Sequence, residues 1–151
     1  MNKKEETVEH IREFNRFYTV LVGSLNTHFL GSKYSITETR ILFELLSHKK
    51  CYAKDIVEYL HIDKSYMSRI IKSFEKNGLI MKEMSQFDHR AFLITLTDKG
   101  QMETNMLIEK TNQQIHEWID GLNLQECQEI CSAMNTIKHY LSNDERKMKN
   151  E

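Results

Sequence analysis

The chain has 151 residues, enough for one domain or for a compact domain with a few long helices. Charged residues make up 28% of it and hydrophobic residues 40%, a balance typical of a soluble globular protein. Hydrophobic runs stay well short of the ~20 residues that span a bilayer, and the N-terminus lacks a secretory signal, so we expect no membrane segment. The three cysteines fit neither a disulfide framework nor a zinc ribbon, which indicates a reducing, cytoplasmic location.

The net charge of −1 is unevenly distributed along the chain. Residues 32–100 hold 12 Lys and Arg against 9 Asp and Glu, a net charge of +3. The remaining residues hold 9 against 13, a net charge of −4. A basic middle between acidic ends is expected when only the middle contacts phosphate, so the distribution favours a nucleic-acid-binding segment there.

Residues 5–30 are predicted to form one long helix, because hydrophobic residues recur there at every third or fourth position. The absence of proline from the chain allows such a helix to run unbroken. A stripe this wide and aromatic requires a packing partner, either the C-terminal helices or a second subunit. Its members are Val8, Ile11, Phe14, Phe17, Leu21, Leu25 and Phe29.

Two shorter helices follow in the order of a helix-turn-helix motif. Ser35 and Glu38 have the spacing of a capping box and open the first of them. Cys51 and Tyr52 are expected to form a short strand, and residues 53–60 the next helix. The expected buried positions of these two helices are Ile41, Leu42, Leu45, Leu46, Ile56, Val57 and Leu60.

Residues 63–77 predict a helix with one hydrophobic and one basic face, and the rest of the chain is arranged around it. Asp63 is its expected N-cap. The hydrophobic face holds Met67, Ile70, Ile71 and Phe74, and the opposite face holds Ser65, Arg69, Lys72 and Lys76. A row of hydrogen-bond donors on a packed helix matches the acceptors of the DNA major groove. The alternative is an ordinary surface helix with a solvated basic face.

Two strands, at residues 79–84 and 91–97, follow directly and predict a β-hairpin with a polar tip at 85–90. A hairpin after a basic helix makes a wing, whose tip fits a minor groove. Arg90 is the expected tip residue, because narrow A·T-rich grooves attract guanidinium groups. Asp88 is expected to pair with Arg90 and fix its orientation. The alternative is a surface hairpin with an incidental ion pair.

Two further amphipathic helices are predicted at residues 99–119 and from a capping arrangement at Asn123 and Glu126 to Leu141. The fold class is therefore mainly α with a small β-wing (α+β). We expect a winged helix-turn-helix domain at residues 32–99, flanked by helical dimerisation regions at 1–31 and 100–151. Such a two-fold dimer would present two reading helices about one turn of DNA apart.

The chain resembles the MarR (multiple antibiotic resistance regulator) family of bacterial winged-helix repressors over nearly its whole length. Three stretches carry the resemblance in order: Ile36-Thr-Glu-Thr-Arg-Ile-Leu42, then Asp63-Lys-Ser-Tyr-Met-Ser-Arg69 with Phe74-Glu-Lys-Asn-Gly-Leu-Ile80, then the wing. The wing signature is the most specific piece, and it consists of Asp88-His-Arg90 followed by Leu96-Thr-Asp-Lys-Gly100.

The resemblance implies a homodimer that binds a pseudo-palindromic operator in double-stranded DNA and is released by a small molecule or another effector. It implies that Arg90 enters the minor groove with Asp88 supporting it. The effector site and the effector itself are not given by the sequence. The residues expected to face the major groove or its flanking phosphates are Lys64, Ser65, Tyr66, Ser68, Arg69 and Lys72.

Two departures from the family pattern bear on regulation. The peroxide-sensing branch uses a reactive cysteine in its first helix, and this sequence has none before Cys51. Tyr52 stands where many members have a Ser or Thr cap. The position of Cys51 near a helix start suggests a lowered pKa. The i, i+4 spacing of Cys127 and Cys131 suggests metal or redox sensing. Burial as small core residues is the simpler interpretation of Cys127 and Cys131, and a core or inert surface position is the simpler interpretation of Cys51.

Catalysis is not expected, because the sequence holds no nucleophile elbow, phosphate loop, metalloprotease motif or dinucleotide fingerprint. We expect no cofactor. We also expect no resident metal, since the seven histidines lack paired ligand spacing, and a zinc site using His28 or His116 is the alternative. The hypothesis is thus a MarR-type regulator, most simply a repressor. The alternatives are a winged-helix module for protein–protein contact without its own operator, and a metal- or redox-responsive regulator.

Overall fold

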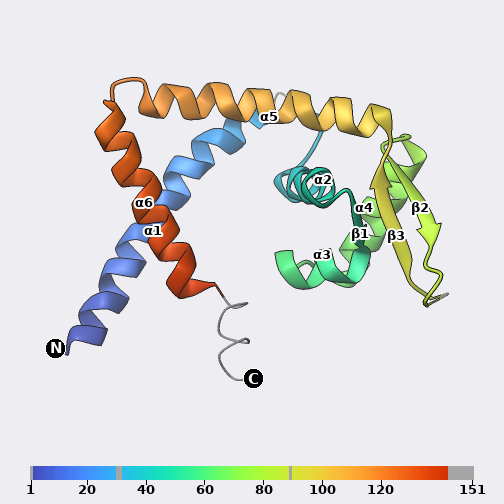
Figure 1. Ribbon diagram of the computed structural model, residues 1–151, viewed down its shortest axis with the longest axis horizontal. Coiled ribbons are helices and arrows are strands. Elements are labelled where there is room, and N and C mark those ends of the chain that lie inside the picture. Colours follow the sequence, from blue (N-terminus) through green and yellow to red (C-terminus); the bar gives the residue numbers. More distant parts are fainter. Residues whose placement is uncertain (1, 30–31, 89, 143–151) are drawn as a thin grey trace. The chain divides into compact units, whose positions relative to one another are not determined.

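The computed structural model describes residues 2–29, 32–88 and 90–142. Helices dominate it, and one small antiparallel sheet completes it, which confirms the predicted fold class (Figure 1). The elements in chain order are α1 (Lys3–Phe29), α2 (Ile36–His48), β1 (Lys50–Tyr52), α3 (Ala53–Leu60), α4 (Lys64–Lys76), β2 (Ile80–Met84), β3 (Phe92–Leu96), α5 (Asp98–Ile119) and α6 (Leu124–Leu141). Within these ranges, the helices are all too short or too polar to cross a bilayer.

The chain forms two compact units, divided within α5 between Asn112 and Gln113. The first contains the helix-turn-helix and the sheet, and the second contains the end of α5 and all of α6. Asn123 caps α6 with both hydrogen bonds of a capping box, as its spacing with Glu126 predicts. No residue of α6 is buried.

The sheet has the strand order β1-β3-β2, with both neighbouring pairs antiparallel. The predicted β2–β3 hairpin is present, with Met84 opposite Phe92 nearest its tip. The short strand predicted at Cys51 and Tyr52 is also present, and it pairs with the other edge of β3, Cys51 opposite Ile94. This third strand ties the base of the wing to the segment that leads into α3.

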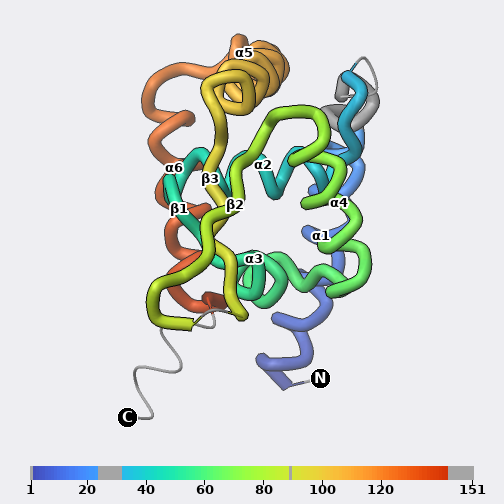
Figure 2. Tube along the Cα trace, turned by 90° about the vertical axis from the view of Figure 1, so that its right-hand side faces the viewer, coloured from blue at the N-terminus to red at the C-terminus, as the bar shows by residue number. Residues whose placement is uncertain are grey.

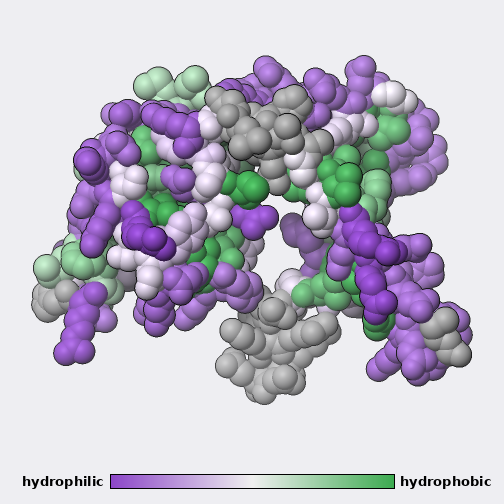
Figure 3. Space-filling model, turned by 180° about the vertical axis from the view of Figure 1, so that it is seen from behind, coloured by the Kyte–Doolittle hydropathy of each residue, from purple (hydrophilic) through white to green (hydrophobic). Residues whose placement is uncertain are grey.

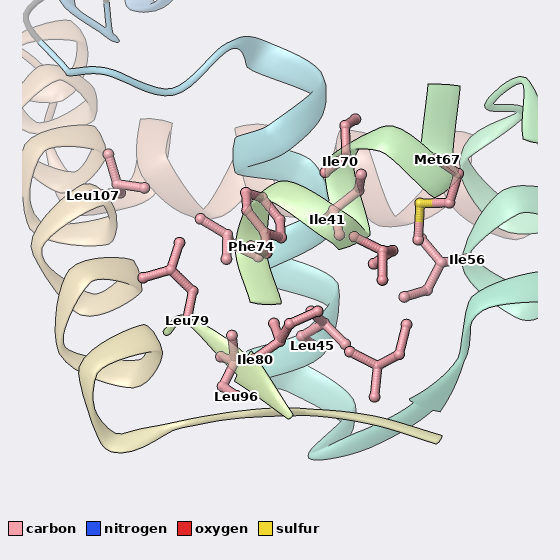
Figure 4. Packing of buried hydrophobic residues seen from close by; sticks show 13 residues of the cluster. Ile41, Leu45, Ile56, Met67, Ile70, Phe74, Leu79, Ile80, Leu96 and Leu107 are labelled. Atoms are coloured by element: carbon pink, nitrogen blue, oxygen red, sulfur yellow. The ribbon is translucent and has the colours of Figure 1, made fainter. Parts of the chain in front are cut away.

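The hydrophobic core lies between α2, α3, α4 and the sheet (Figure 4). Side chains from these elements point toward one another around Phe74 and Ile41, which are at most 1% exposed. The face of α4 that the sequence assigned to the core, including Met67 and Ile70, is buried as predicted. The long helix α5 also reaches this core, through Leu107.

The end of α4 is fixed by a Schellman motif. Gly78 has the positive φ (+74°) that this motif needs, and its N–H donates to the Glu75 carbonyl at 3.1 Å. The Leu79 N–H donates to the Phe74 carbonyl at 2.9 Å, and both side chains pack in the core. The chain therefore leaves α4 in one direction and enters β2 directly.

The first turn of α5 binds the residues that follow α4, and we call this contact the α4–α5 joint (residues 77–79 with 97–100). The Thr97 hydroxyl donates to the Gly78 carbonyl at 2.6 Å, and the Thr97 N–H donates to the Leu79 carbonyl at 2.9 Å. The Lys99 ammonium donates to the Asn77 carbonyl at 2.9 Å. The carbonyls of the three residues that follow α4 thus accept hydrogen bonds from Thr97, directly before α5, and from Lys99 in its first turn, so the end of α4 is bonded to the start of α5.

A second contact joins α5 to the core through Tyr34, which precedes α2. Its hydroxyl donates to the Glu103 carboxylate of α5, and its ring lies edge-on to Phe74 of α4 at 6.3 Å. Lys33 lies 3.7 Å from the same carboxylate. Burial of the Tyr34 hydroxyl, and secondly its bond to Glu103, raise its pKa above the ordinary value, so it remains a neutral donor.

Replacing Gly100 tests the α4–α5 joint. A Cβ at this position would lie 2.1 Å from the Leu79 carbonyl oxygen, a backbone atom that cannot move aside. We therefore expect Gly100→Ala to lower the free energy of unfolding by about 2–3 kcal/mol. Urea denaturation measures this change in the free energy of unfolding.

The matched control is Gly121→Ala, because a Cβ there meets no atom within 4 Å among the described residues. We expect that variant to unfold within about 0.5 kcal/mol of the parent. Equal stability of the two variants would contradict a tight joint.

Candidate nucleic-acid interface

The exposed side of α4 is the first part of the candidate interface. The Asp63 carboxylate accepts a hydrogen bond from the Tyr66 N–H at 3.0 Å, so the predicted N-cap is confirmed. Capping matters here because it fixes the first turn, from which side chains reach a groove. The exposed side chains of this helix that the sequence assigned to DNA form what we call the reading face: Lys64, Ser65, Tyr66, Ser68, Arg69 and Lys72.

Hydrogen-bond donors predominate on the reading face, and its one aromatic side chain, Tyr66, lies beside the cation of Arg69. The Arg69 guanidinium lies 5.6 Å from the centroid of the Tyr66 ring, within range of a cation–π contact. This contact restricts the rotamers of a long side chain before any ligand arrives. Buried residues of the same helix hold the opposite face in the core, so the reading face can meet a ligand without rearranging the fold.

The wing, formed by the β2–β3 hairpin, is the second part of the candidate interface. In Figures 1 and 2 the β2–β3 hairpin extends so that its tip lies at the end of the domain away from the start of α5. The Ser85 N–H donates to the Ala91 carbonyl at 3.0 Å and closes the hairpin. The tip between them holds the predicted Asp88 and Arg90, both exposed, whereas His89 lies outside the described residues.

The Ser85 hydroxyl organises this tip, although Ser85 itself is only 1% exposed. It accepts hydrogen bonds from the N–H groups of Phe87 (3.2 Å) and Asp88 (3.4 Å). On its other side it shares a hydrogen bond of 3.0 Å with the Tyr52 hydroxyl. One buried oxygen thus connects the turn of the wing to the start of α3, and we call these residues (Tyr52, Ser85, Phe87 and Asp88) the wing frame.

The prediction that the Asp88 carboxylate pairs with the Arg90 guanidinium is wrong. The Asp88 carboxylate instead accepts from the Arg90 backbone N–H at 3.0 Å, and among the described residues no ion pair joins the two side chains. An aspartate reaches the backbone two residues ahead more readily than a side chain on the far side of a turn. Asp88 therefore shapes the backbone at Arg90 and leaves the guanidinium available.

Tyr52 and Ser85 were missed as members of this interface by the sequence reasoning. Tyr52 stands where many members of the family have a Ser or Thr cap, and its side chain makes no capping hydrogen bond to α3. The signal that marks both residues is their polarity at positions where a strand ends beside a hydrophobic core. Their partnership spans 33 residues of sequence, so only the fold reveals it.

The cysteines form neither a disulfide nor a metal site in the described part of the chain. Burial, and secondly the nearby Glu44 and Asp55, raise the pKa of Cys51, so the lowered pKa suggested by its position at a helix start is wrong. Cys127 is half-buried and Cys131 exposed, and both are free thiols. Within the described residues no three His, Cys, Asp or Glu side chains gather as a metal site would require.

A capped helix with an exposed row of donors, followed by a framed β-hairpin, defines a winged helix-turn-helix protein. Residues 34–92, which contain α2, α3, α4 and β2 and end at the first residue of β3, match the model of the MarR family. Over this segment the chain is similar to the MarR family, and its curated relatives are transcriptional regulators.

Comparison with known proteins agrees with this assignment. The organic hydroperoxide resistance transcriptional regulator of Bacillus subtilis is 27% identical over 129 residues, which cover 83% of this chain and 80% of that protein. Among solved structures, the regulator BldR from Sulfolobus solfataricus has a TM-score of 0.74 at 17% identity, covering 93% of this chain and 100% of that one. A Listeria monocytogenes protein assigned to the MarR family and crystallised with 26mer DNA has a TM-score of 0.71 at 23% identity, covering 93% of both chains. These structures share the fold of this chain.

Removing the Ser85 hydroxyl tests the wing frame. We expect Ser85→Ala to reduce the free energy of unfolding by about 1–2 kcal/mol, because two N–H groups lose their acceptor. Amide hydrogen exchange should speed up at Phe87 and Asp88. The control Ser47→Ala removes an exposed hydroxyl from α2 and should change neither quantity. Unchanged exchange at the tip in Ser85→Ala would show that the frame does not order the wing.

Proposed function

We propose that the chain is a homodimeric, sequence-specific DNA-binding regulator, a repressor that an effector releases from its operator. The observation that carries this proposal is the reading face of α4, whose donors are exposed and whose first turn is fixed by the Asp63 cap. The major groove admits one such helix and presents acceptors to it. A module for protein–protein contact has little need of this row together with a basic wing tip.

The residues of the interface take different roles in this proposal. Lys64 and Lys72 contact phosphates and set the affinity, since phosphate contacts position a protein without reading sequence. Ser65, Tyr66, Ser68 and Arg69 set the choice of bases. Arg90 enters the minor groove, and Asp88 supports it through the backbone bond described above.

The homodimer is supported by the hydrophobic side chains that the single chain leaves in water. In α1, Val20 is 76% exposed and Phe17 61%, and in α6, Leu124 is 84% exposed. These residues belong to helices predicted to need a packing partner, and continuous hydrophobic stripes of this kind mark interaction surfaces. A second copy would cover the same stripe on both subunits.

Release by an effector needs a physical connection between the dimer helices and the reading face. The α4–α5 joint supplies a candidate, because α5 continues from the DNA-binding unit into the second unit while its first turn holds the end of α4. An effector that favours another orientation of α5 would then change the spacing of the two reading helices. Organic hydroperoxide, which the name of the Bacillus relative mentions, is not proposed as this effector, because the first helix contains no cysteine.

Genomic selection with the purified protein tests the proposal, followed by anisotropy titration of the enriched duplex at several salt concentrations. We expect an inverted repeat that is bound tightly with a steep salt dependence. Arg90→Ala should weaken the binding of this inverted repeat. If no sequence is enriched and salt has little effect, the DNA-binding function is wrong, and the protein-contact alternative takes its place.

Arg69 should discriminate between sequences. If Arg69 contacts a base, Arg69→Ala costs roughly 1–3 kcal/mol of operator binding and relaxes the preference at one position of each half-site. Titrations of operator and random duplexes measure this. The control Arg12→Ala removes the same side chain from α1 and should leave both affinities unchanged. Equal losses on both duplexes would make Arg69 a phosphate contact instead.

The exposed stripe of α6 should form part of the dimer interface. We expect Met134→Glu to raise the dimer dissociation constant about a hundredfold, because the two-fold axis places the charge in the interface twice. Sedimentation velocity over a concentration series measures it. Ser132→Glu adds the same charge to the other side of α6 and should leave the dimer intact. Dissociation by both variants would indicate a general charge effect and contradict the assigned interface.

A further inference from the structure

The tip of the wing carries a hydrophobic side chain that no contact within the fold explains. Phe87 is 96% exposed, the highest value among the large hydrophobic residues that the structure describes. Single hydrophobic residues at a surface are common, but they usually bury part of their area against neighbours. A phenylalanine held almost wholly in water gains nothing for the stability of this chain.

The backbone that carries Phe87 is nevertheless fixed. Its N–H donates to the buried Ser85 hydroxyl, and the next N–H, of Asp88, donates to the same oxygen. The Ala91 N–H donates to the Asp88 carbonyl at 3.0 Å and closes the turn behind it. The wing frame therefore presents this ring outward at a defined place, in the way that a binding residue is presented.

The same turn also presents a cation. Arg90 follows three residues later, and its backbone is held by the Asp88 carboxylate while its side chain is exposed. A hydrophobic ring and a guanidinium thus share one narrow turn. The minor groove of DNA offers both kinds of partner, since its potential attracts cations while its walls and floor offer sugar and base surfaces to hydrophobic side chains.

Further hydrophobic side chains lie next to the tip and extend this surface along the hairpin. Met84 (53% exposed) and Phe92 (44%) face each other across β2 and β3, on the sheet face that carries Ile80 and Leu96 closer to the core. The Lys82 ammonium lies 5.8 Å from the Phe92 ring. In Figure 3 the far end of the hairpin, at the lower left, accordingly shows hydrophobic surface beside hydrophilic surface.

We propose that Phe87 is a wedge residue, which enters the minor groove beside Arg90 and packs against one base step at each outer end of the operator. This inference rests on the proposed DNA-binding function and adds a specificity determinant to it. Apolar wedges partly unstack a step, and pyrimidine–purine steps open most easily. Phe87 therefore selects operators by the deformability of the step beneath the wing, and Arg90 selects them by groove width.

A protein partner fits these observations less well than DNA. The hydrophobic side chains of the hairpin lie beside the exposed guanidinium of Arg90, and the phosphates along a groove complement this cation whereas a hydrophobic protein surface does not. Phe87 also stands on the same hairpin as the predicted minor-groove arginine, so any duplex that receives Arg90 brings a groove to Phe87. The ring and the cation then act on neighbouring nucleotides.

The wedge has an energetic signature that separates it from a charge contact. Burying a phenylalanine ring releases no counterions, so Phe87→Ala should weaken operator binding about tenfold at every salt concentration, without changing the salt slope. Arg90→Ala should reduce that slope by about one. Phe87→Leu keeps a hydrophobic wedge and should recover part of the affinity. Gln86→Ala, at the exposed neighbouring position, should change nothing.

The test uses full-length protein and the duplex enriched by genomic selection, with 2-aminopurine placed at the steps beneath the wings. Wild-type protein should raise the 2-aminopurine fluorescence through unstacking, and Phe87→Ala should abolish the rise. A stiff A-tract step narrows the groove for Arg90 in both proteins but opposes only the wedge. Replacing the flexible step with it should therefore lower severalfold the ratio of wild-type affinity to Phe87→Ala affinity.

The outcomes separate this inference from the function on which it rests. Tight wild-type binding with equal affinity and equal fluorescence for Phe87→Ala would overturn the wedge and leave the DNA-binding function standing. A Phe87→Ala variant that loses affinity through a reduced salt slope would also overturn it, since the ring would then only position Arg90. Failure of the wild-type protein to enrich any duplex would overturn both.

Discussion

The α4–α5 joint is the contact on which the rest of the molecule depends. The three residues after α4 carry backbone carbonyls that water would otherwise satisfy. Thr97, directly before α5, and Lys99 in its first turn satisfy them, and Gly100 allows the close approach because it has no Cβ. The long helix α5 is therefore bonded directly to the end of α4. Any displacement of α5 relative to the core must either break these hydrogen bonds or move α4.

A second polar contact serves the wing in the same way. The buried Ser85 hydroxyl satisfies two N–H groups of the turn and meets Tyr52, so the hairpin tip is ordered by a residue near the start of α3. The two parts of the candidate interface are thus fixed independently, one by α5 and one by Tyr52. Hydrophobic burial holds the domain together, while these hydrogen bonds determine the direction in which its functional side chains point.

The long helices present the opposite situation. Their hydrophobic stripes were predicted from a period of three to four residues, and the single chain leaves many of these residues exposed. Burying these side chains would contribute favourable free energy to association with another chain, and a symmetric dimer is the simplest arrangement that buries them. Phe87 is likewise exposed to water in the single chain. Its place on a narrow, hydrogen-bonded turn beside Arg90 suits a groove and not a broad interface.

The sequence by itself determined the local features. Asp63 and Ser35 predicted their caps, the spacing of Met67, Ile70 and Phe74 predicted the buried face of α4, and alternation predicted the hairpin, since each depends on neighbours within a few residues. Only the tertiary structure decided which polar groups meet across long separations: Tyr52 with Ser85, Tyr34 with Glu103, and Lys99 with the end of α4. It also showed that Asp88 bonds the backbone of Arg90 and not its side chain. Periodicity assigns residues to faces, but hydrogen-bond partners depend on how those faces are packed.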